Sequence, residues 1–214
     1  CEVILYSPGH TTTVPELSDD HMEKLVDLWC ERFNALRQDE GIKYVFIFEN
    51  RGEAVGVTMP HPHGQIYGYS FVPKKIELEL ASSGGYFEEK GRCLFCDMLK
   101  AELDFQKRVI FSNEHFTVFL PFFTEYPYGV YIFANSHKSN LDELCMHNAP
   151  VNGPDVHESY HFHIEFFPPM RSADKIKYNA SSETGVWAHC NPTCPEQTAQ
   201  ELREAYERYM KSLT

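Results

Sequence analysis

Two histidines separated by one residue form the densest group of chemistry-bearing side chains in the sequence. His61 and His63 lie in the segment PHPHGQ at residues 60–65, and Gln65 follows two residues later. On a β-strand, side chains at i and i+2 point to the same face, so these three could address one site. A neutral imidazole is a good nucleophile near pH 7, although a His-x-His pair taken alone is more often a surface or metal-binding pair.

The residues before this pair favour chemistry on phosphate. Asn50 begins the turn segment NRG, and Gly56 and Thr58 lie in the segment GVT. Such segments supply turn backbone and small hydrogen-bond donors that suit a phosphate group. The alternative is that these residues only shape a turn.

A pair of cysteines forms a second candidate group. Cys93 and Cys96 are the only pair with telling spacing among the seven cysteines. In a chain of 214 residues with eleven histidines and no leader pattern at its start, this spacing favours zinc over a disulfide. Cys30 lies inside a helical pattern, and we expect it to be a buried apolar residue.

Composition restricts the class of protein. The chain is 43% hydrophobic and 14% aromatic, which is enough for a packed core. Thirty-one acidic residues against nineteen basic ones give a net charge of −12, which speaks against nucleic acid or an anionic membrane as partner. No apolar run approaches the roughly 20 residues that span a bilayer. We therefore expect a cytoplasmic protein that acts on small molecules.

The elements that position these residues are predicted from the spacing of apolar side chains. Helical spacing predicts one helix between Ser18 and Gly41 and another that begins near Pro195. Strands are predicted at residues 44–48, 65–72, 109–111, 116–120, 130–133 and 160–167. This mixture predicts an α+β fold, with antiparallel sheet flanked by helices.

A weak internal repeat divides the chain. The first half has the order SPGH, PEL, a long helix and HxH; the second has the order NSH, DEL and HxH. The repeat matches His137 with His10, and only the first copy keeps the complete motif around His63. We expect two tandem units, residues 1–85 and residues 86–214.

The two copies differ in length, and two breaks in the chain are expected. The sequence starts as if inside a strand, so we expect the first unit to be incomplete at its start. The second copy has one residue where the first has a helix, so we expect a physical gap between Cys145 and Met146. The missing stretch would be about 20–40 residues long, from ordinary helix and loop lengths.

At these residues the chain resembles the galactose-1-phosphate uridylyltransferase family of the histidine-triad superfamily. The shared motifs are HPHGQ at 61–65, FEN with later glycines at 48–56, SPGH at 7–10, and HxH followed by FFPP and MRSA at 161–173. The resemblance covers essentially the whole chain and implies two histidine-triad-like units. It implies a nucleotidyltransferase of galactose metabolism that passes a uridylyl group from UDP-glucose to galactose 1-phosphate by a ping-pong mechanism.

The resemblance also implies roles for individual residues. His63 would be the nucleophile that carries the uridylyl group, and Gln65 would donate to a phosphoryl oxygen. Related hydrolases carry a histidine at the position of Gln65; a glutamine cannot titrate and suits transfer between phosphates. Asn50, Gly56 and Thr58 match positions that contact the nucleotide.

Two further functions stay open beside this one. A related adenylyltransferase or dinucleotide phosphorylase would use the same nucleophile on another nucleotide. A non-catalytic zinc scaffold would need only the cysteine pair and the histidines, but has no use for Gln65.

The resemblance implies a structural zinc site in the first unit. His10 and His61 match two of its ligands, and the matching CxxC would lie upstream of the first residue. Two ligands cannot close a tetrahedral site. The alternative is that His10 makes only a local hydrogen bond.

The repeat implies a second, pseudo-symmetric zinc site. Cys93, Cys96 and His137 would supply three ligands, and the fourth is unassigned because Ser159, taken as the counterpart of His61, is a poor ligand. The alternative is a reduced thiol pair that binds nothing.

A further metal set is implied by the family alone. Glu79, His147, His161 and His163 match positions that bind a second metal in some members, and mixed nitrogen and oxygen ligands suit iron or a second zinc ion. The alternative is that His161 and His163 are vestiges of a duplicated motif.

The segment after the second HxH matches the part of the family that holds the hexose phosphate. Lys177 would meet the phosphate as a point charge, and Glu183 would accept hydrogen bonds from sugar hydroxyls, with Tyr178 beside them. In the family this stretch comes from the opposite subunit, so the resemblance implies a homodimer. The alternative is a solvated loop.

Overall fold

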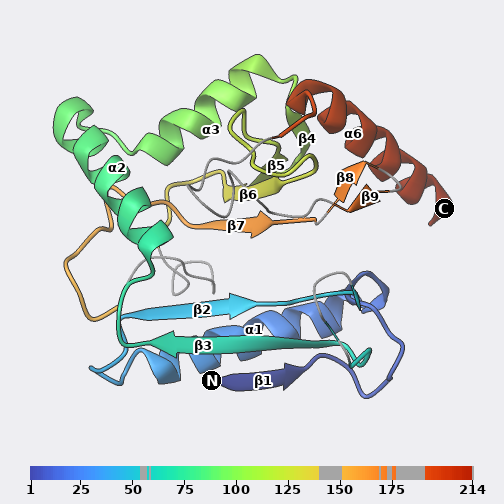
Figure 1. Ribbon diagram of the computed structural model, residues 1–214, viewed down its shortest axis with the longest axis horizontal. Helices are drawn as coiled ribbons and strands as arrows, with labels where there is room; N and C mark the ends of the chain where they lie inside the picture. The colour runs from blue at the N-terminus through green and yellow to red at the C-terminus, as the bar shows by residue number, and fades with distance from the viewer. Residues whose placement is uncertain are drawn as a thin grey trace. The chain divides into compact units, whose positions relative to one another are not determined.

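The computed structural model shows an α+β protein, as predicted (Figure 1). It describes residues 1–53, 57, 59–139, 151–168, 170–172, 175–176 and 191–213. The helices are α1 (Asp19–Leu36), α2 (Lys74–Lys90), α3 (Leu94–Phe105) and α6 (Pro195–Ser212), with a 3-10 turn at Val14–Glu16. The strands are β1 (Glu2–Leu5), β2 (Tyr44–Phe48), β3 (His63–Tyr69), β4 (Val109–Ser112), β5 (Phe116–Phe119), β6 (Val130–Ala134), β7 (His163–Phe166), β8 (Met170–Ser172) and β9 (Lys175–Ile176).

The chain forms two compact units. Unit 1 comprises Cys1–Phe95 and His137–Phe162, and unit 2 comprises Cys96–Ser136 and His163–Thr214. The expected boundary between residues 85 and 86 concerns the two sequence repeats and stays a prediction. The expected gap between Cys145 and Met146 lies outside the described residues.

The sheet of unit 1 places the second histidine of the HxH motif at the start of its central strand. Its order is β1-β3-β2, and both pairings are antiparallel. β3 begins at His63, two residues earlier than the predicted strand, so His63 lies opposite Leu5 of β1. Gln65 lies opposite Val3 on one side and Phe48 on the other. The backbone of the motif is therefore held from both sides.

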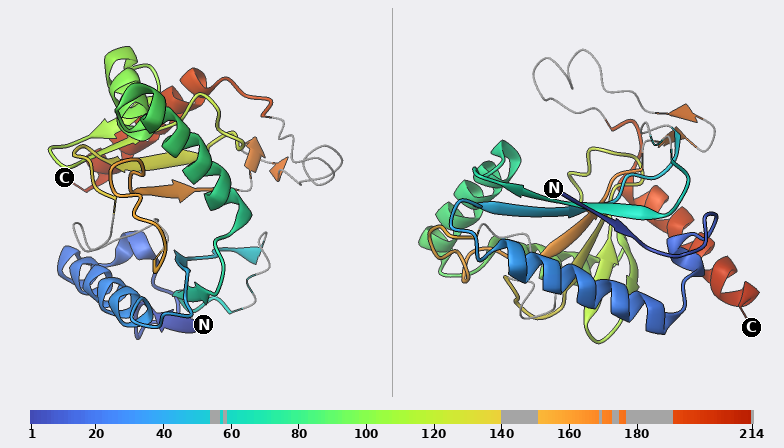
Figure 2. Two further views of the ribbon diagram at one scale, coloured as in Figure 1. Left: turned by 90° about the vertical axis from the view of Figure 1, so that its left-hand side faces the viewer. Right: turned by 90° about the horizontal axis from the view of Figure 1, so that it is seen from below.

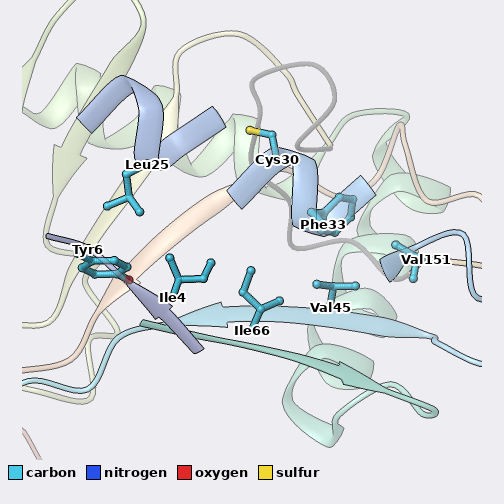
Figure 3. Packing of buried hydrophobic residues seen from close by; sticks show 8 residues of the cluster. All are labelled: Ile4, Tyr6, Leu25, Cys30, Phe33, Val45, Ile66 and Val151. Carbon is cyan, nitrogen blue, oxygen red and sulfur yellow. The ribbon is translucent and has the colours of Figure 1, made fainter. Parts of the chain in front are cut away.

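One face of this sheet is covered by α1, as both views of Figure 2 show. The helix begins after Ser18, as predicted, and directs Leu25 and Phe33 toward the sheet (Figure 3). They share one buried cluster with Ile66 of β3 and with Cys30 of the helix. Phe33 and Ile66 are fully buried, and each side chain of this size stabilises the fold by about 1.5–3 kcal/mol on burial. Because side chains alternate along β3, the core takes Ile66 and leaves the odd-numbered residues on the other face.

A segment from late in the chain completes the core of unit 1. Val151 packs into the same hydrophobic cluster and donates its backbone N–H to the carbonyl oxygen of Lys43. Asn152 adopts a left-handed backbone conformation, with φ of 52°, which asparagine tolerates better than most residues. Its side-chain amide lies 3.0 Å from the carbonyl oxygens of three residues: Arg37, Asp39 and Ile42. These bonds attach the segment that carries His161 to unit 1.

Unit 2 is built on a four-stranded antiparallel sheet of order β4-β5-β6-β7. Helix α6, which begins at Pro195 as predicted, packs against β4. Arg108 forms a salt bridge with Glu102 at 2.8 Å and another, at 2.7 Å, with Glu196 in the first turn of α6. Hydrogen bonds from the Cys194 thiol and from Arg108 lower the pKa of Glu196 to about 2.

Helices α2 and α3 are additional to the elements predicted from periodicity. The interior of α2 reads ASSGG, and serine and glycine are weak helix formers that blur an apolar pattern. Gly91 ends this helix in a left-handed conformation, with φ of 65°. No helix in the described part of the chain is both long and apolar enough to cross a membrane.

Candidate active site

His63 starts β3 with its ring held in one tautomer. Its Nδ1 lies 2.8 Å from the backbone carbonyl oxygen of His61. A carbonyl oxygen only accepts hydrogen bonds, so Nδ1 carries the proton and Nε2 carries the lone pair. The side chain is half-buried, on the face of the sheet away from α1. The geometry therefore presents an imidazole with a nucleophilic Nε2.

Gln65 follows on the same face of β3. The hydroxyl of Tyr67 donates to its Oε1 at 2.8 Å, so the amide oxygen has a partner and the Nε2 protons are left to donate. Spacing along the sequence predicts that residues 63, 65 and 67 share a face, but it does not predict this hydrogen bond. Tyr67 is therefore a residue that the sequence analysis missed.

Gly64 separates the two site residues because no side chain fits at its position. A Cβ there would collide with the hydroxyl of Tyr6, which lies under the strand on the α1 side. Tyr6 is 2% exposed, and its burial raises the pKa of the phenol above the ordinary value, with the charge of Glu49 adding to the shift. The phenol therefore stays neutral and fixes glycine in the motif.

The loop after β2 brings charge near the candidate nucleophile. Desolvation raises the pKa of the Glu49 carboxyl, and the charge of Arg51 opposes that shift, as does that of His63 when its ring is protonated. Asn50, expected to bind substrate, is exposed in this loop. The other residues expected to bind substrate lie outside the described residues: Gly56, Thr58, Lys177, Tyr178 and Glu183.

His10 and His61 are in direct contact. Their Nδ1 atoms lie 2.9 Å apart, and Nε2 of His61 is buried without a hydrogen-bond partner among the described residues. Two lone pairs cannot face each other at this distance without a proton or a cation between them. Two nitrogens bound to tetrahedral zinc at about 2.0–2.1 Å would lie about 3.3 Å apart. The observed 2.9 Å is shorter than this and is the length of an N–H···N hydrogen bond, as the local alternative expects. The role of the pair as two zinc ligands stays a prediction.

A group of four zinc-type ligands, called here the Cys/His group, forms around the CxxC pair. Ligand atoms of Cys93, Cys96, His137 and His161 all lie within 4.8 Å of one another. The fourth member, which the sequence analysis left unassigned, is His161, which is fully buried. Counting along the chain gave the wrong counterpart of the zinc-type histidine of the first copy.

Hydrogen bonds around the Cys/His group determine which nitrogen of His137 is protonated and give the Cys93 thiol an acceptor. Nε2 of His137 lies 2.7 Å from the carbonyl oxygen of His157, so Nε2 carries the proton and Nδ1 is left to bind a metal. The backbone oxygen of Ser159 accepts from the Cys93 thiol at 3.6 Å. This donor set fits zinc, which prefers thiolate and imidazole in a four-coordinate site.

Three of the four residues expected at the second metal are described: Glu79, His161 and His163. His161 lies in the Cys/His group instead. In unit 1, Oε2 of Glu79 accepts a 2.9 Å hydrogen bond from the buried Tyr160. In unit 2, Nε2 of His163 lies 3.1 Å from Glu165 Oε1. Glu165 is a further residue that the sequence analysis missed, although it lies two residues after His163, as Gln65 lies after His63. His147 lies outside the described residues.

Comparisons with known proteins agree with these motifs. The sequence model described as "Galactose-1-phosphate uridyl transferase, N-terminal domain" matches residues 1–73. A galactose-1-phosphate uridylyltransferase of Thermotoga maritima is 39% identical over 95% of this chain and 73% of the relative, and one of Haemophilus influenzae is 30% identical over 99% and 69%. A solved structure titled "Structure of uridylyltransferase" superposes with a TM-score of 0.89 at 26% identity, over 96% of this chain and 74% of that one.

Proposed function

Because the chain belongs to the galactose-1-phosphate uridylyltransferase family, we propose that it transfers a uridylyl group from UDP-glucose to galactose 1-phosphate through a covalent intermediate on His63. The observation that carries the assignment of His63 is its hydrogen bond from Nδ1 to the carbonyl oxygen of His61. This bond leaves Nε2 as the nucleophilic atom on the open face of β3.

In the first half-reaction, Nε2 of His63 attacks the phosphorus next to the uridine. The N–P bond forms as the P–O bond to glucose 1-phosphate breaks, and the electron pair of that bond leaves on the phosphate oxygen. The ring becomes a phosphorylated imidazolium. Its Nδ1 keeps its proton and donates it to the carbonyl oxygen of His61, and this hydrogen bond stabilises the positive charge. The imidazole remains a good leaving group for the return step.

In the second half-reaction, a phosphate oxygen of galactose 1-phosphate attacks the same phosphorus. The N–P bond breaks, its electron pair returns to Nε2, and UDP-galactose leaves. Both the leaving and the attacking groups are phosphates, which need little help from a proton donor or acceptor. Gln65, which donates but does not titrate, suits this exchange and would bind a phosphoryl oxygen through its Nε2 protons.

The proposed metal content follows from the donor sets. Zinc would be held by Cys93, Cys96, His137 and His161, and a second zinc ion by His10 and His61 with further ligands. Such zinc ions would supply structural cross-links, because all four positions of the Cys/His group are filled by the protein. The assignment of Glu79, His147, His161 and His163 to iron or a further zinc ion is proposed from the family.

A homodimer in the cytoplasm is the proposed form of the enzyme. In this arrangement Lys177, Tyr178 and Glu183 would hold the hexose phosphate in the site of the neighbouring subunit. A molecular mass in solution of twice the chain mass would support the dimer, and a monomer with full activity would contradict it.

Isotope exchange tests the proposed function. A ping-pong enzyme exchanges labelled glucose 1-phosphate into UDP-glucose when galactose 1-phosphate is absent, because the first half-reaction is complete by itself. We expect this exchange with UDP-glucose and not with ADP-glucose. Exchange only with ADP-glucose would favour the adenylyl alternative, and exchange that requires both substrates would contradict the covalent route.

A further inference from the structure

Tyr67 is the only described residue that holds the side-chain amide of Gln65, and we propose that it is a positioning residue for uridylyl transfer. Its hydroxyl donates to Gln65 Oε1 at 2.8 Å and makes no other hydrogen bond within the described part of the chain. The inference rests on the proposed function, since it assigns a role in that reaction.

The orientation of the amide matters because its two ends are chemically opposite. The nitrogen end donates two protons, whereas the oxygen end carries lone pairs that would repel a phosphoryl oxygen. The two ends are similar in size, so packing alone does not select one orientation. A donor fixed on the oxygen end selects the orientation in which Gln65 offers its protons to the phosphate.

Tyr67 is suited to this selection because its ring is held in place. Phe48 of β2 contacts it edge-on, with ring centroids 4.9 Å apart, and Tyr69 contacts it from the next position on the same face at 6.1 Å. If the amide of Gln65 turned over, the phenol oxygen would accept from Nε2, but one amide proton would then be spent on Tyr67. The phenol proton would also have no acceptor among the described residues, so the observed orientation is favoured. The aromatic contacts thus fix the ring, and the ring fixes the amide.

The test is a double-mutant cycle on the first half-reaction. The rate constant for formation of the uridylyl-protein from saturating UDP-glucose is measured by rapid quench and intact mass. Tyr67→Phe removes the hydroxyl and keeps the ring, and we expect it to lower this rate constant about three- to tenfold, the range for a lost neutral hydrogen bond. In the Gln65→Ala background the same change should alter the rate by less than about twofold, because no amide remains to be oriented.

Tyr69→Phe is the matched control, because the hydroxyl of Tyr69 makes no hydrogen bond to the described residues. We expect it to leave the rate unchanged, and thermal unfolding of each variant reports on the fold. An equal loss in both backgrounds, or no loss from Tyr67→Phe in either, would overturn the inference while leaving the proposed function intact. A wild-type protein that forms no adduct at all would overturn the proposed function, and the inference with it.

Discussion

The two His-x-His segments of the chain have the same spacing but different surroundings. On β3, His63 is half-buried and its Nε2 is the unprotonated nitrogen, because Nδ1 donates to a carbonyl oxygen. On β7, His163 is 1% exposed and its Nε2 lies 3.1 Å from the carboxylate of Glu165. An ionised carboxylate only accepts hydrogen bonds, so Nε2 of His163 carries the proton.

The two strands also differ in the residue that follows two positions after this histidine. On β3 it is Gln65, whose Oε1 accepts from Tyr67 and whose amide protons are left to donate. On β7 it is Glu165, which engages the histidine itself. The ring of His163 is also stacked on Tyr131, with centroids 5.5 Å apart and planes at 10°.

The comparison shows that spacing alone does not make a nucleophile. Both strands point a histidine and a polar residue to one face, but only β3 leaves a lone pair on an accessible nitrogen. The first histidine of each pair lies beside other zinc-type ligands: His61 contacts His10, and His161 belongs to the Cys/His group. If His63 is the nucleophile, as proposed, the two segments share a histidine with metal-type neighbours and differ in the second histidine.

Loss of the nucleophile on β3 should have the largest effect. His63→Ala should lower the overall exchange rate by on the order of 10⁴-fold or more, since no other described group offers the attacking atom. Because the side chain is half-buried, its removal should change the thermal midpoint little. Exchange kinetics close to wild type in this variant would contradict the asymmetry between the two strands.

Loss of a ligand from the Cys/His group should affect stability rather than chemistry. Cys93→Ser should lower the zinc content by about one equivalent and the free energy of unfolding by on the order of 3 kcal/mol. Elemental analysis and chemical unfolding measure the two effects. Cys30→Ala, at a buried cysteine of α1 outside the group, is the matched control and should keep all of the metal. Equal metal in both variants would mean that the cysteine pair binds nothing.

A titratable group at position 65 should divert the intermediate to water. Gln65→His should raise the release of free UMP roughly tenfold relative to transfer, because the imidazole can take a proton from attacking water. Gln65→Ala supplies the comparison, since it removes the amide without adding a base. If both variants release UMP at the same rate, the account of the glutamine is wrong.

Replacing the acidic residue of β7 with the glutamine found on β3 should have the smallest effect on adduct formation and stability. Glu165→Gln gives this strand the pattern His-x-His-x-Gln, but His163 stays buried, so no second uridylyl group should appear in the intact mass. The weaker partner should lower the free energy of unfolding by about 1 kcal/mol. A second adduct in this variant would show that the Glu165 carboxylate, and not burial, prevents His163 from taking up a uridylyl group.

Sequence patterns predicted the elements whose signals are local. The start of α1 after Ser18 was predicted, whereas the helix ends at Leu36, before the predicted end next to Gly41. Strand β2 was predicted at the residues observed. Helix α2 was missed because Gly84 and Gly85 interrupt its apolar pattern. Spacing on a strand also placed His63 and Gln65 on one face.

The features of the site that could not be predicted from the sequence depend on contacts between residues far apart in the chain. His161 joins the Cys/His group because the segment anchored by Asn152 brings it there, and no count along the chain predicts that approach. The collision that fixes Gly64 depends on Tyr6, which is 58 residues away. The tautomer of His63 depends on a single hydrogen bond, which only coordinates reveal.

The site of covalent modification tests the central claim most directly. The wild-type protein is mixed with UDP-glucose in the absence of galactose 1-phosphate, and intact mass is followed by peptide mapping under conditions that preserve phosphoramidates. The account predicts one uridylyl group per chain, located on the peptide that contains His63. A uridylyl group on the peptide that contains His163, or no adduct while exchange proceeds, would contradict it.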